Sequence, residues 1–286
     1  MTDAGNSTFW NENAVTRGLA RHSVGRKVLN AVGARFMKKK LNSFELLLDL
    51  QDRWGVSKYI LKYGEYDAEL CKLVKSFLPA QAVCIDIGAN IGFWTNFLIS
   101  ECKAAKVFSI EPEPRNLNLF RENVKLNSSD DRVQLFANAV GDQPGELSLF
   151  LSDDNAGDHQ LYDSKEGRQQ IKVDVKRVDD LIGDQKIDFI KMDVQGFEPY
   201  VVGGMLRILE KNRDVVMLTE FWPSGIKKAG SDSMAMLERF DERGFRFFFV
   251  DPAKNVLTEL LLAEIHGRIE EGHHIDLILS RHPLRG

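Results

Sequence analysis

The stretch Val83-Cys-Ile-Asp-Ile-Gly-Ala-Asn-Ile-Gly-Phe-Trp94 decides the fold. It begins as an apolar run typical of a buried strand, passes through two glycines and continues into a segment of helical character. A strand, a glycine turn and a helix in this order are typical of a doubly wound α/β sheet, in which a cofactor lies at the carboxyl end of the first strand. We expect Gly88 to make the sharp turn and Gly92 to let a cofactor or a neighbouring strand approach closely.

Strand-like and helix-like segments alternate outward from this stretch, which predicts a mainly parallel sheet with helices on both faces. Helices are expected at 91–101 and 115–126, and two extra strands, 146–151 and 171–178, should flank a polar loop over 152–170. The remaining expected strands are 82–87, 106–110, 133–137, 187–192, 215–220, 245–250 and 275–280.

Length and composition indicate a globular protein with one large domain and an appendage. The chain has 286 residues, of which 43% are hydrophobic and 28% charged. No apolar run is long enough to span a membrane, and the first ten residues lack the pattern of a secretory signal. The three cysteines form no paired motif, so we expect a reduced, cytoplasmic protein. The net charge of −4 gives no electrostatic reason to expect nucleic-acid binding.

Residues 1–60 are expected to form a basic, helical extension, followed by the main domain at 61–286. The first forty residues hold eight Lys/Arg and only two acids. Val24, Val28, Val32 and Phe36 recur at four-residue spacing, which predicts an amphipathic helix over 14–40. Such a helix packs on its own domain or on a second subunit, which would make a homodimer, or lies on an anionic membrane.

Charge at the glycine turn distinguishes between two cofactors. The dinucleotide fingerprint needs a middle glycine to admit the pyrophosphate, and here Asn90 holds that position. Asp86 stands directly before the turn, where a carboxylate disfavours pyrophosphate and suits the ammonium and sulfonium of S-adenosylmethionine. The turn therefore favours a methyl donor over NAD.

Three further strands deliver polar side chains to the same edge of the sheet. Glu111 ends the second strand, where an acid accepts hydrogen bonds from ribose hydroxyls, and Asn138 ends the third, near the expected adenine. Asp193 ends the fourth strand and Glu198 follows it, which suits substrate positioning or proton acceptance. Purely structural roles for these residues stay open. Glu111 and Asp193 could each cap a helix, and Asn138 could form a turn.

These motifs together resemble the FkbM-type methyltransferases. The resemblance rests on Cys84-Ile-Asp-Ile-Gly-Ala-Asn-Ile-Gly-Phe-Trp-Thr95, Ile110-Glu-Pro112, Asn138-Ala-Val-Gly141 and Ile190-Lys-Met-Asp-Val-Gln-Gly-Phe-Glu198, and covers about residues 61–250. Gln195 departs from the glutamate of many members. The resemblance implies a class I methyltransferase sheet with an antiparallel last strand, S-adenosylmethionine as methyl donor, and transfer to a hydroxyl of a sugar or natural product.

The resemblance also implies positions for the cofactor. Asp86, Gly88 and Asn90 would border its methionine part, and Glu111 its ribose. The adenine would meet Asn138 and Ala139, and Tyr66 would close over the cofactor.

A neutral alcohol or amide acceptor also needs a base, and the polar loop offers His159. Asp158 or Asp154 would orient this histidine, although a solvated loop histidine is an equal alternative. Phe221 and Trp222 are candidates for the wall of an acceptor pocket. Since no ligand set for a metal stands out, we expect catalysis without a metal.

Several functions remain compatible with the sequence. The leading one is O-methylation of a small molecule or glycan in biosynthesis. The alternatives are N-methylation of a peptide or amide side chain, a non-catalytic cofactor-binding or interaction protein, and a dehydrogenase, which Asn90 and Asp86 disfavour.

Overall fold

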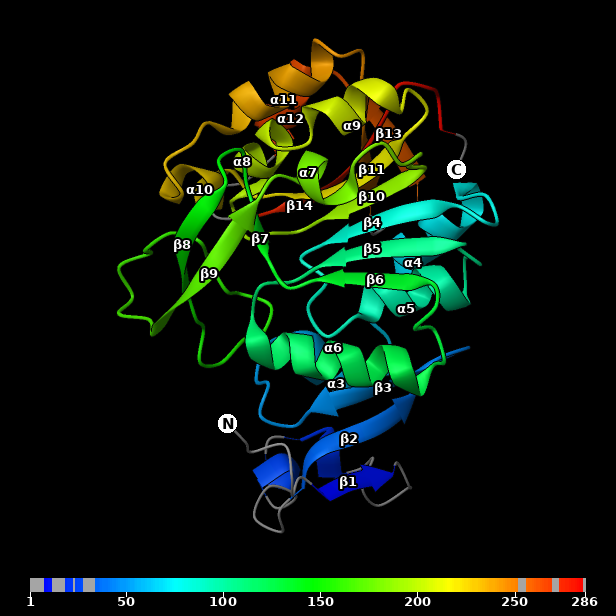
Figure 1. Cartoon of the computed structure of the whole chain (residues 1–286), viewed down its shortest axis with the longest axis vertical. Coiled ribbons are helices and arrows are strands. Elements are labelled where there is room, and N and C mark those ends of the chain that lie inside the picture. Colours follow the sequence, from blue (N-terminus) through cyan, green and yellow to red (C-terminus); the bar gives the residue numbers. More distant parts are fainter. Residues whose placement is uncertain are drawn as a thin grey trace.

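The computed structural model describes residues 8–11, 19–22, 24–27, 34–251, 256–268 and 273–284. Its centre is an eight-stranded sheet (Figure 1). Across the sheet the strands follow the order β13 (Val256–Leu260), β12 (Arg246–Asp251), β14 (Ile275–Ser280), β11 (Val216–Phe221), β10 (Phe189–Met192), β4 (Val83–Ile87), β5 (Lys106–Ile110) and β6 (Val133–Phe136).

The sheet has the doubly wound order that the sequence predicts. The five strands from β11 to β6 are parallel, and β14 is antiparallel to β11, so the predicted antiparallel last strand is confirmed. The sequence did not predict β13, which pairs with β12 at the edge. Strand order reverses at β4, because β5 lies on one side of it and β10 on the other. The carboxyl end of β4 is therefore the point at which a ligand is expected.

Helices cover both faces of the sheet, since successive residues of a strand point to opposite sides. Cys84 of β4 joins one hydrophobic cluster and Ile85 joins the other. The helices are α3 (Val56–Tyr63), α4 (Ala68–Phe77), α5 (Phe93–Ser100), α6 (Pro114–Leu126), α7 (Val178–Ile182), α8 (Glu198–Gly203), α9 (Leu206–Lys211), α10 (Pro223–Lys228), α11 (Ser233–Asp241) and α12 (Leu262–Arg268). Among the described residues, no helix has the length and apolarity needed to cross a membrane.

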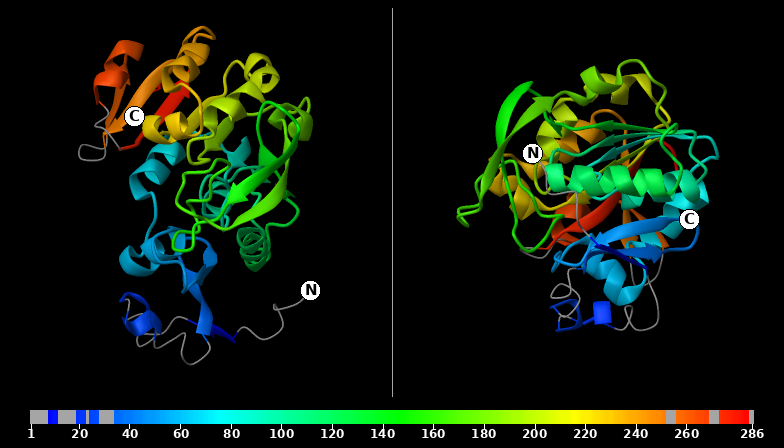
Figure 2. Two further views of the ribbon diagram at one scale, coloured as in Figure 1. Left: turned by 90° about the vertical axis from the view of Figure 1, so that its left-hand side faces the viewer. Right: turned by 60° about the horizontal axis from the view of Figure 1, so that its bottom comes forward.

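The two extra strands are present and form a hairpin. They are β8 (Gly145–Phe150) and β9 (Gln170–Lys176), which pair in antiparallel fashion, and β7 (Ala139–Val140) adds a parallel strand to β9. Figures 1 and 2 show this small sheet projecting from the side of the large one. The predicted polar loop connects its strands and is called the insert loop (residues 152–169) below.

The predicted helix over 14–40 is wrong in its last part. Residues 34–40 form strand β2 (Ala34–Lys40), which pairs with β1 (Thr8–Asn11) and, in antiparallel fashion, with β3 (Glu45–Asp49). Val24 is 71% exposed, and Val28 and Val32 lie outside the described residues. Met37 is buried opposite Leu48, so strand pairing decides this segment. The expected membrane contact through this segment stays a prediction.

The expected boundary between residues 60 and 61 falls inside α3. Leu46 and Leu48 of β3 share one hydrophobic cluster with Leu98 of α5 and Cys84 of β4. The N-terminal segment is thus packed into the main domain at this point. Figures 1 and 2 show the three N-terminal strands at one end of the molecule, next to α6.

Asn123 of α6 and Asn127, the residue that caps its C-terminus, form hydrogen bonds with the backbone at the free edge of β3. Asn123 accepts a hydrogen bond from the Leu47 N–H at 2.6 Å and donates to the Leu47 carbonyl at 3.3 Å. One turn later, Asn127 accepts from the Glu45 N–H at 2.9 Å and donates to its carbonyl at 2.7 Å. Because a side-chain amide offers the same donor and acceptor as a peptide group, α6 replaces a neighbouring strand at this edge.

Replacing Asn123 by alanine should lower the free energy of unfolding by about 2–4 kcal/mol, because it leaves buried backbone groups of Leu47 and Ile91 without a partner. Urea denaturation measures this loss. The exposed Asn118 of the same helix provides the control, and its alanine variant should stay within about 0.5 kcal/mol of the wild type. Equal losses in the two variants would contradict the proposed role of Asn123.

Candidate active site

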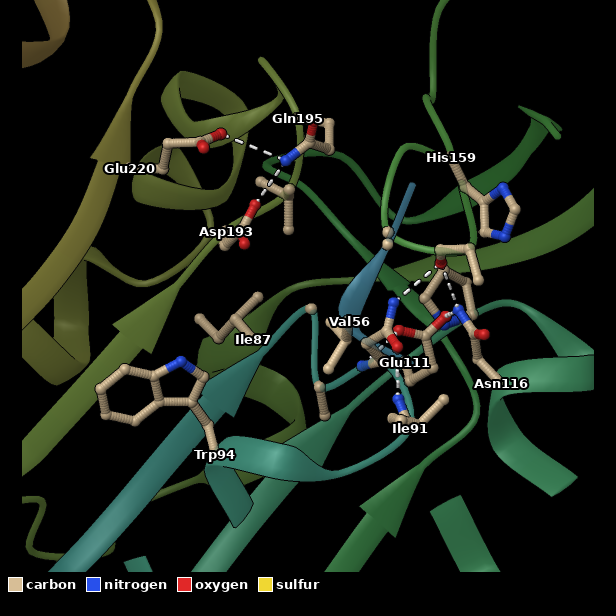
Figure 3. A pocket seen from close by; sticks show the side chains of 18 of the residues that line it. Val56, Ile87, Ile91, Trp94, Glu111, Asn116, His159, Asp193, Gln195 and Glu220 are labelled. Carbon is tan, nitrogen blue, oxygen red and sulfur yellow. Dashed lines mark hydrogen bonds between the residues drawn. The ribbon is translucent and has the colours of Figure 1, made fainter. Parts of the chain in front are cut away.

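A cavity of about 410 Å3 lies at the carboxyl ends of β4, β5, β10 and β11. Its volume is within the usual range for small-molecule sites. Figure 3 shows two groups of polar side chains in it: Glu111, Asn116 and His159 on one side, and Asp193, Gln195 and Glu220 on the other. Trp54, Val56 and Tyr59 from the N-terminal segment also line it. The predicted extension therefore contributes directly to the site.

The glycine turn is constrained by the neighbouring protein. Gly88 has φ +78°, and a Cβ atom there would lie 1.9 Å from the Asp193 carbonyl oxygen. Gly92 has φ +86°, and its Cβ would meet the Phe120 ring at 2.9 Å. Asn90 has φ +51°, a left-handed conformation that asparagine tolerates. The close approaches are thus made to β10 and α6, and they hold the turn in place under the cavity.

Glu111 organises one end of the cavity. Its carboxylate accepts hydrogen bonds from the Asn90 N–H at 2.8 Å and the Glu113 N–H at 2.9 Å. Burial raises the pKa of Glu111 to about 7, although these two hydrogen bonds oppose the shift. The N-cap of α6 is Glu113, which accepts from the Asn116 N–H. Glu111 is therefore not the helix cap, and its carboxylate faces the cavity.

Two sequence-predicted acids are not brought to the cavity wall. Asp86 is fully buried in β4, where it accepts a hydrogen bond from the Thr95 hydroxyl at 2.6 Å. Glu198 is also fully buried and accepts from the Val194 N–H at 3.0 Å. Burial raises the pKa of Glu198 to about 7. Their carboxylates stabilise the strand and the turn from beneath, because each lies on the face of its element that points into the core.

Asp193, Gln195 and Glu220 form a connected group at the other end of the cavity. The Gln195 Nε2 donates to Asp193 Oδ1 at 2.7 Å and to Glu220 Oε2 at 3.1 Å. The Lys191 Nζ lies 3.4 Å from Asp193 Oδ2, and His274 Nε2 lies 3.5 Å from Glu220 Oε1. Of this group, only Asp193 was given a role in chemistry from the sequence, and Gln195 was noted only as a departure from the family pattern. The position of Glu220 at the carboxyl end of β11 was the signal for it, but only Phe221 and Trp222 were considered there.

Buried carboxylates surround this group and raise one another's pKa values. Burial, followed by the charge of Asp193, raises the pKa of Glu220 to about 9. Burial raises the pKa of Asp67 to about 7 and that of Asp276 to about 6. These two acids line a smaller cavity of about 90 Å3, which shares Asp193 and Glu220 with the main one.

The insert loop closes the other side of the cavity. The Ala156 carbonyl accepts hydrogen bonds from Asn90 Nδ2 at 2.8 Å and from Asn116 Nδ2 at 2.9 Å. The backbone N–H groups of Arg53 and Trp54 both donate to the Asp154 carbonyl, at 2.9 and 3.0 Å. The insert loop is thus attached to the glycine turn and to the N-terminal segment at once.

His159 lines the cavity, but its hydrogen bond does not suit a base. Its Nδ1 accepts from the Ser152 N–H at 3.1 Å, so the neutral ring carries its proton on Nε2 and acts there as a donor. Burial lowers the pKa of His159 to about 4. The expected partners are engaged elsewhere, since Asp158 pairs with Arg168 at 2.7 Å and Asp154 with Arg53 at 3.1 Å. The interpretation of His159 as the base is therefore not supported.

The His159 ring should remain neutral down to about pH 4, with its proton on Nε2. Two-dimensional NMR of protein labelled with 15N in the histidine ring measures both the tautomer and the pKa. His22, which is exposed, serves as the internal reference. A His159 midpoint near 6.5, the value of a free histidine, would contradict this prediction.

Some of the remaining predicted residues line the cavity and others do not. Trp222 lines the cavity, whereas Phe221 is part of the hydrophobic core. Sequence reasoning missed Trp54, Tyr59, Lys191, Gln195 and Glu220, all of which line the cavity. Of the predicted cofactor and catalytic residues, those lining the cavity are Tyr66, Gly88, Asn90, Glu111, Asn138, Ala139, His159 and Asp193, and those outside its wall are Asp86, Gly92 and Glu198.

The sheet order, the antiparallel last strand and a cavity over the reversal point define a class I methyltransferase fold. Residues 86–247, more than half of the chain, match the family described as the methyltransferase FkbM domain. The chain belongs to the FkbM methyltransferase family and is an enzyme that transfers methyl groups. Of the alternatives considered from the sequence, the family supports methyl transfer.

Named relatives agree with this family. The chain is 31% identical over 188 residues to 2-O-methyltransferase NoeI of Sinorhizobium fredii, and the alignment covers 59% of this chain and 76% of NoeI. It is 24% identical over 149 residues to Methyltransferase 1 of Beauveria bassiana, and this alignment covers 44% of this chain and 59% of that protein. This chain thus matches less than two thirds of the length of the second relative.

Solved structures share the fold. The Pyrococcus horikoshii protein PH0793 has a TM-score of 0.50 and 15% identity, with 91% of this chain and 82% of that chain covered. Methyltransferase FkbM from Methylobacillus flagellatus KT has a TM-score of 0.45 and 16% identity, with 70% and 44% covered. At 15% identity the likeness to PH0793 shows the fold alone. Within the described part of the chain, no group of three or more His, Cys, Asp or Glu residues is arranged to hold a metal ion.

Proposed function

We propose that the protein is an S-adenosylmethionine-dependent O-methyltransferase that acts on a hydroxyl of a sugar, glycan or natural product. The observation that carries this proposal is the division of one cavity into two ends, with Glu111 at one end and the Asp193–Glu220 pair at the other. The relative NoeI is named a 2-O-methyltransferase, which supports oxygen as the methylated atom.

The cavity residues fit this cofactor. Glu111 would accept hydrogen bonds from the ribose hydroxyls, and Asn138 with the Ala139 backbone would meet the adenine. Pro112, Leu149 and Leu161 supply apolar wall in the same cavity, as a purine ring requires. Carboxylates outnumber lysines around Asp193, and this excess of negative charge suits a cofactor that carries an ammonium and a sulfonium.

When bound, the cofactor supplies a methyl group on a sulfonium, so that a C–O bond to the acceptor forms as the S–CH3 bond breaks with its electrons going to sulfur. Because the donor is already activated, the protein mainly positions the acceptor oxygen and removes its proton. In this proposal the carboxylates at the ends of β10 and β11 take that proton, and His159, near Glu111, serves as a hydrogen-bond donor.

Two measurements test this function. Calorimetric titration should give micromolar binding of S-adenosylhomocysteine and no binding of NAD. Incubation with tritiated S-adenosylmethionine and a panel of monosaccharides, glycosides, phenols and small peptides should label a hydroxyl compound, with the new methyl group located by NMR. Binding of NAD alone would overturn the cofactor assignment, and label found on nitrogen would overturn O-methylation.

A further inference from the structure

We propose that Glu220 is the base that takes the proton of the acceptor hydroxyl, and that it ionises only when the cationic methyl donor enters the cavity. This inference rests on the proposed function and adds to it a named base and a reason for its timing. It arises from three features of the structure: the positions of the Glu220 oxygens, the neighbours of Asp193, and the charges that face Glu220.

The Glu220 carboxyl is held in a defined position. Gln195 Nε2 donates to its Oε2 at 3.1 Å and to Asp193 Oδ1 at 2.7 Å. The backbone of Gln195 is left-handed, with φ +54°, and a Cβ on the next residue, Gly196, would lie 2.6 Å from the Gly225 backbone. The turn is thus packed closely against Gly225, and the Gln195 amide joins the two carboxyls through its two hydrogen bonds.

Glu220 is better placed than Asp193 to accept a proton, because its oxygens have fewer close partners. Both oxygens of Asp193 are engaged, Oδ1 by Gln195 at 2.7 Å and Oδ2 by Lys191 at 3.4 Å. Among the residues that the structure describes, the contact of Glu220 Oε1 is with His274 Nε2, at 3.5 Å, and the His274 side chain is 59% exposed. Glu220 Oε1 therefore has an exposed imidazole as its neighbour, whereas both oxygens of Asp193 have buried or part-buried partners.

The groups that face Glu220 are mostly acidic. Within the described ranges, Lys191 of β10 is the buried cation at this place, and Tyr66 adds a phenol. The carboxyls come from four other places in the fold: Asp193 after β10, Glu198 of α8, Asp67 before α4 and Asp276 of β14. Burial, followed by the charges of Asp193, Glu198 and Asp276, raises the pKa of Glu220 to about 9, so its carboxyl is protonated near neutral pH. A positive charge in the cavity favours the ionised form and expels that proton.

The proton balance then closes over one turnover. The acceptor O–H bond breaks, its proton goes to Glu220 Oε1, and the electron pair of the oxygen forms the new C–O bond. After transfer the sulfur is neutral, and the cavity no longer holds an added positive charge. Glu220 therefore keeps the proton that it took, as in the free protein. The next methyl donor ionises it once more.

Calorimetry tests when Glu220 ionises, and it needs no acceptor. Ligand binding is measured in two buffers of different ionisation enthalpy, and the difference between the two binding enthalpies gives the number of protons released. At about pH 7, where an α-ammonium is still protonated, S-adenosylmethionine should release about one proton on binding to the wild type. S-adenosylhomocysteine, whose sulfur is neutral, should release fewer. The Glu220→Gln variant should release fewer protons with S-adenosylmethionine than the wild type.

The matched control is Glu101→Gln, the same substitution outside the cavity, which should release as many protons as the wild type. If Glu220→Gln still releases the full proton, Glu220 is not the group that ionises and the inference is wrong. If the wild type binds neither ligand, the proposed function itself fails. Thermal unfolding of each variant establishes that it is folded.

Methyl transfer tests the base directly. With the hydroxyl compound that the wild type labels, Glu220→Gln should lower kcat by about 10²–10⁴-fold. Its affinity for S-adenosylhomocysteine should stay within about threefold, because that ligand does not depend on an ionised Glu220. Affinity of the wild type for S-adenosylmethionine should rise with pH below about 9, the pKa of Glu220, and this rise should disappear in the variant. An unchanged kcat in Glu220→Gln would overturn the role of base.

Discussion

Replacing Glu111 by glutamine should weaken binding of S-adenosylhomocysteine by at least about 100-fold. The Glu111 carboxylate accepts from two backbone N–H groups, those of Asn90 and Glu113, one on each oxygen. Glutamine has a single acceptor oxygen, so its NH2 group would face one of these N–H donors. That internal loss affects folding, whereas binding weakens because the ribose hydroxyls would lose a charged acceptor. Losing two charge-assisted hydrogen bonds to the ligand costs about 3 kcal/mol of binding free energy, which is roughly this factor in affinity.

Calorimetric titration measures the effect, and thermal unfolding shows whether the variant is folded. Glu122→Gln is the matched control, because Glu122 is exposed on α6 and lies outside the cavity wall. Its affinity should equal that of the wild type. A Glu111→Gln protein that binds as tightly as the control would show that the ribose is held elsewhere, and the assignment of this end of the cavity would have to be abandoned.

The second large effect is expected from Gly88→Ala. A methyl group at this position would lie 1.9 Å from the Asp193 carbonyl oxygen, in a backbone conformation that already disfavours side chains. Either β4 and β10 separate at their carboxyl ends or the turn unwinds. We expect the free energy of unfolding to fall by about 4 kcal/mol, in the range of severe core substitutions.

Gly64→Ala separates the two causes. Gly64 has φ +86°, but nothing lies within 4 Å of a Cβ atom there, so only backbone strain is added. This variant should lose about 1 kcal/mol. Urea denaturation of both proteins gives the comparison, and equal losses would mean that the contact with Asp193 is not the reason for glycine at position 88.

The pattern of the main sheet was readable from the sequence because each signal is local. Buried strands, glycine turns and helices follow one another from Val83 onward, and the strands 106–110 and 275–280 appear where the sequence predicts them. Parallel strands also bring their carboxyl ends to one edge, so Glu111 and Asp193 were expected in one cavity, and both line it.

The N-terminal segment was misread because its structure depends on distant partners. Lys38 to Lys40 resemble the polar face of a helix, but β2 is formed by pairing with β3, and β3 in turn needs Asn123 of α6 at its other edge. Spacing within the segment itself carries no information about an amide 76 residues away.

The sequence by itself determined the sheet, its reversal point at β4 and the polar residues that follow its strands, because strand alternation, glycine turns and chain order act over a few residues. Only the tertiary structure decided which nitrogen of His159 is free, that Asp86 and Glu198 face the core, and that Gln195 joins Asp193 to Glu220. The reason is physical: protonation states and hydrogen-bond partners depend on burial and on charges brought together from separate elements, and these exist only once the chain has folded.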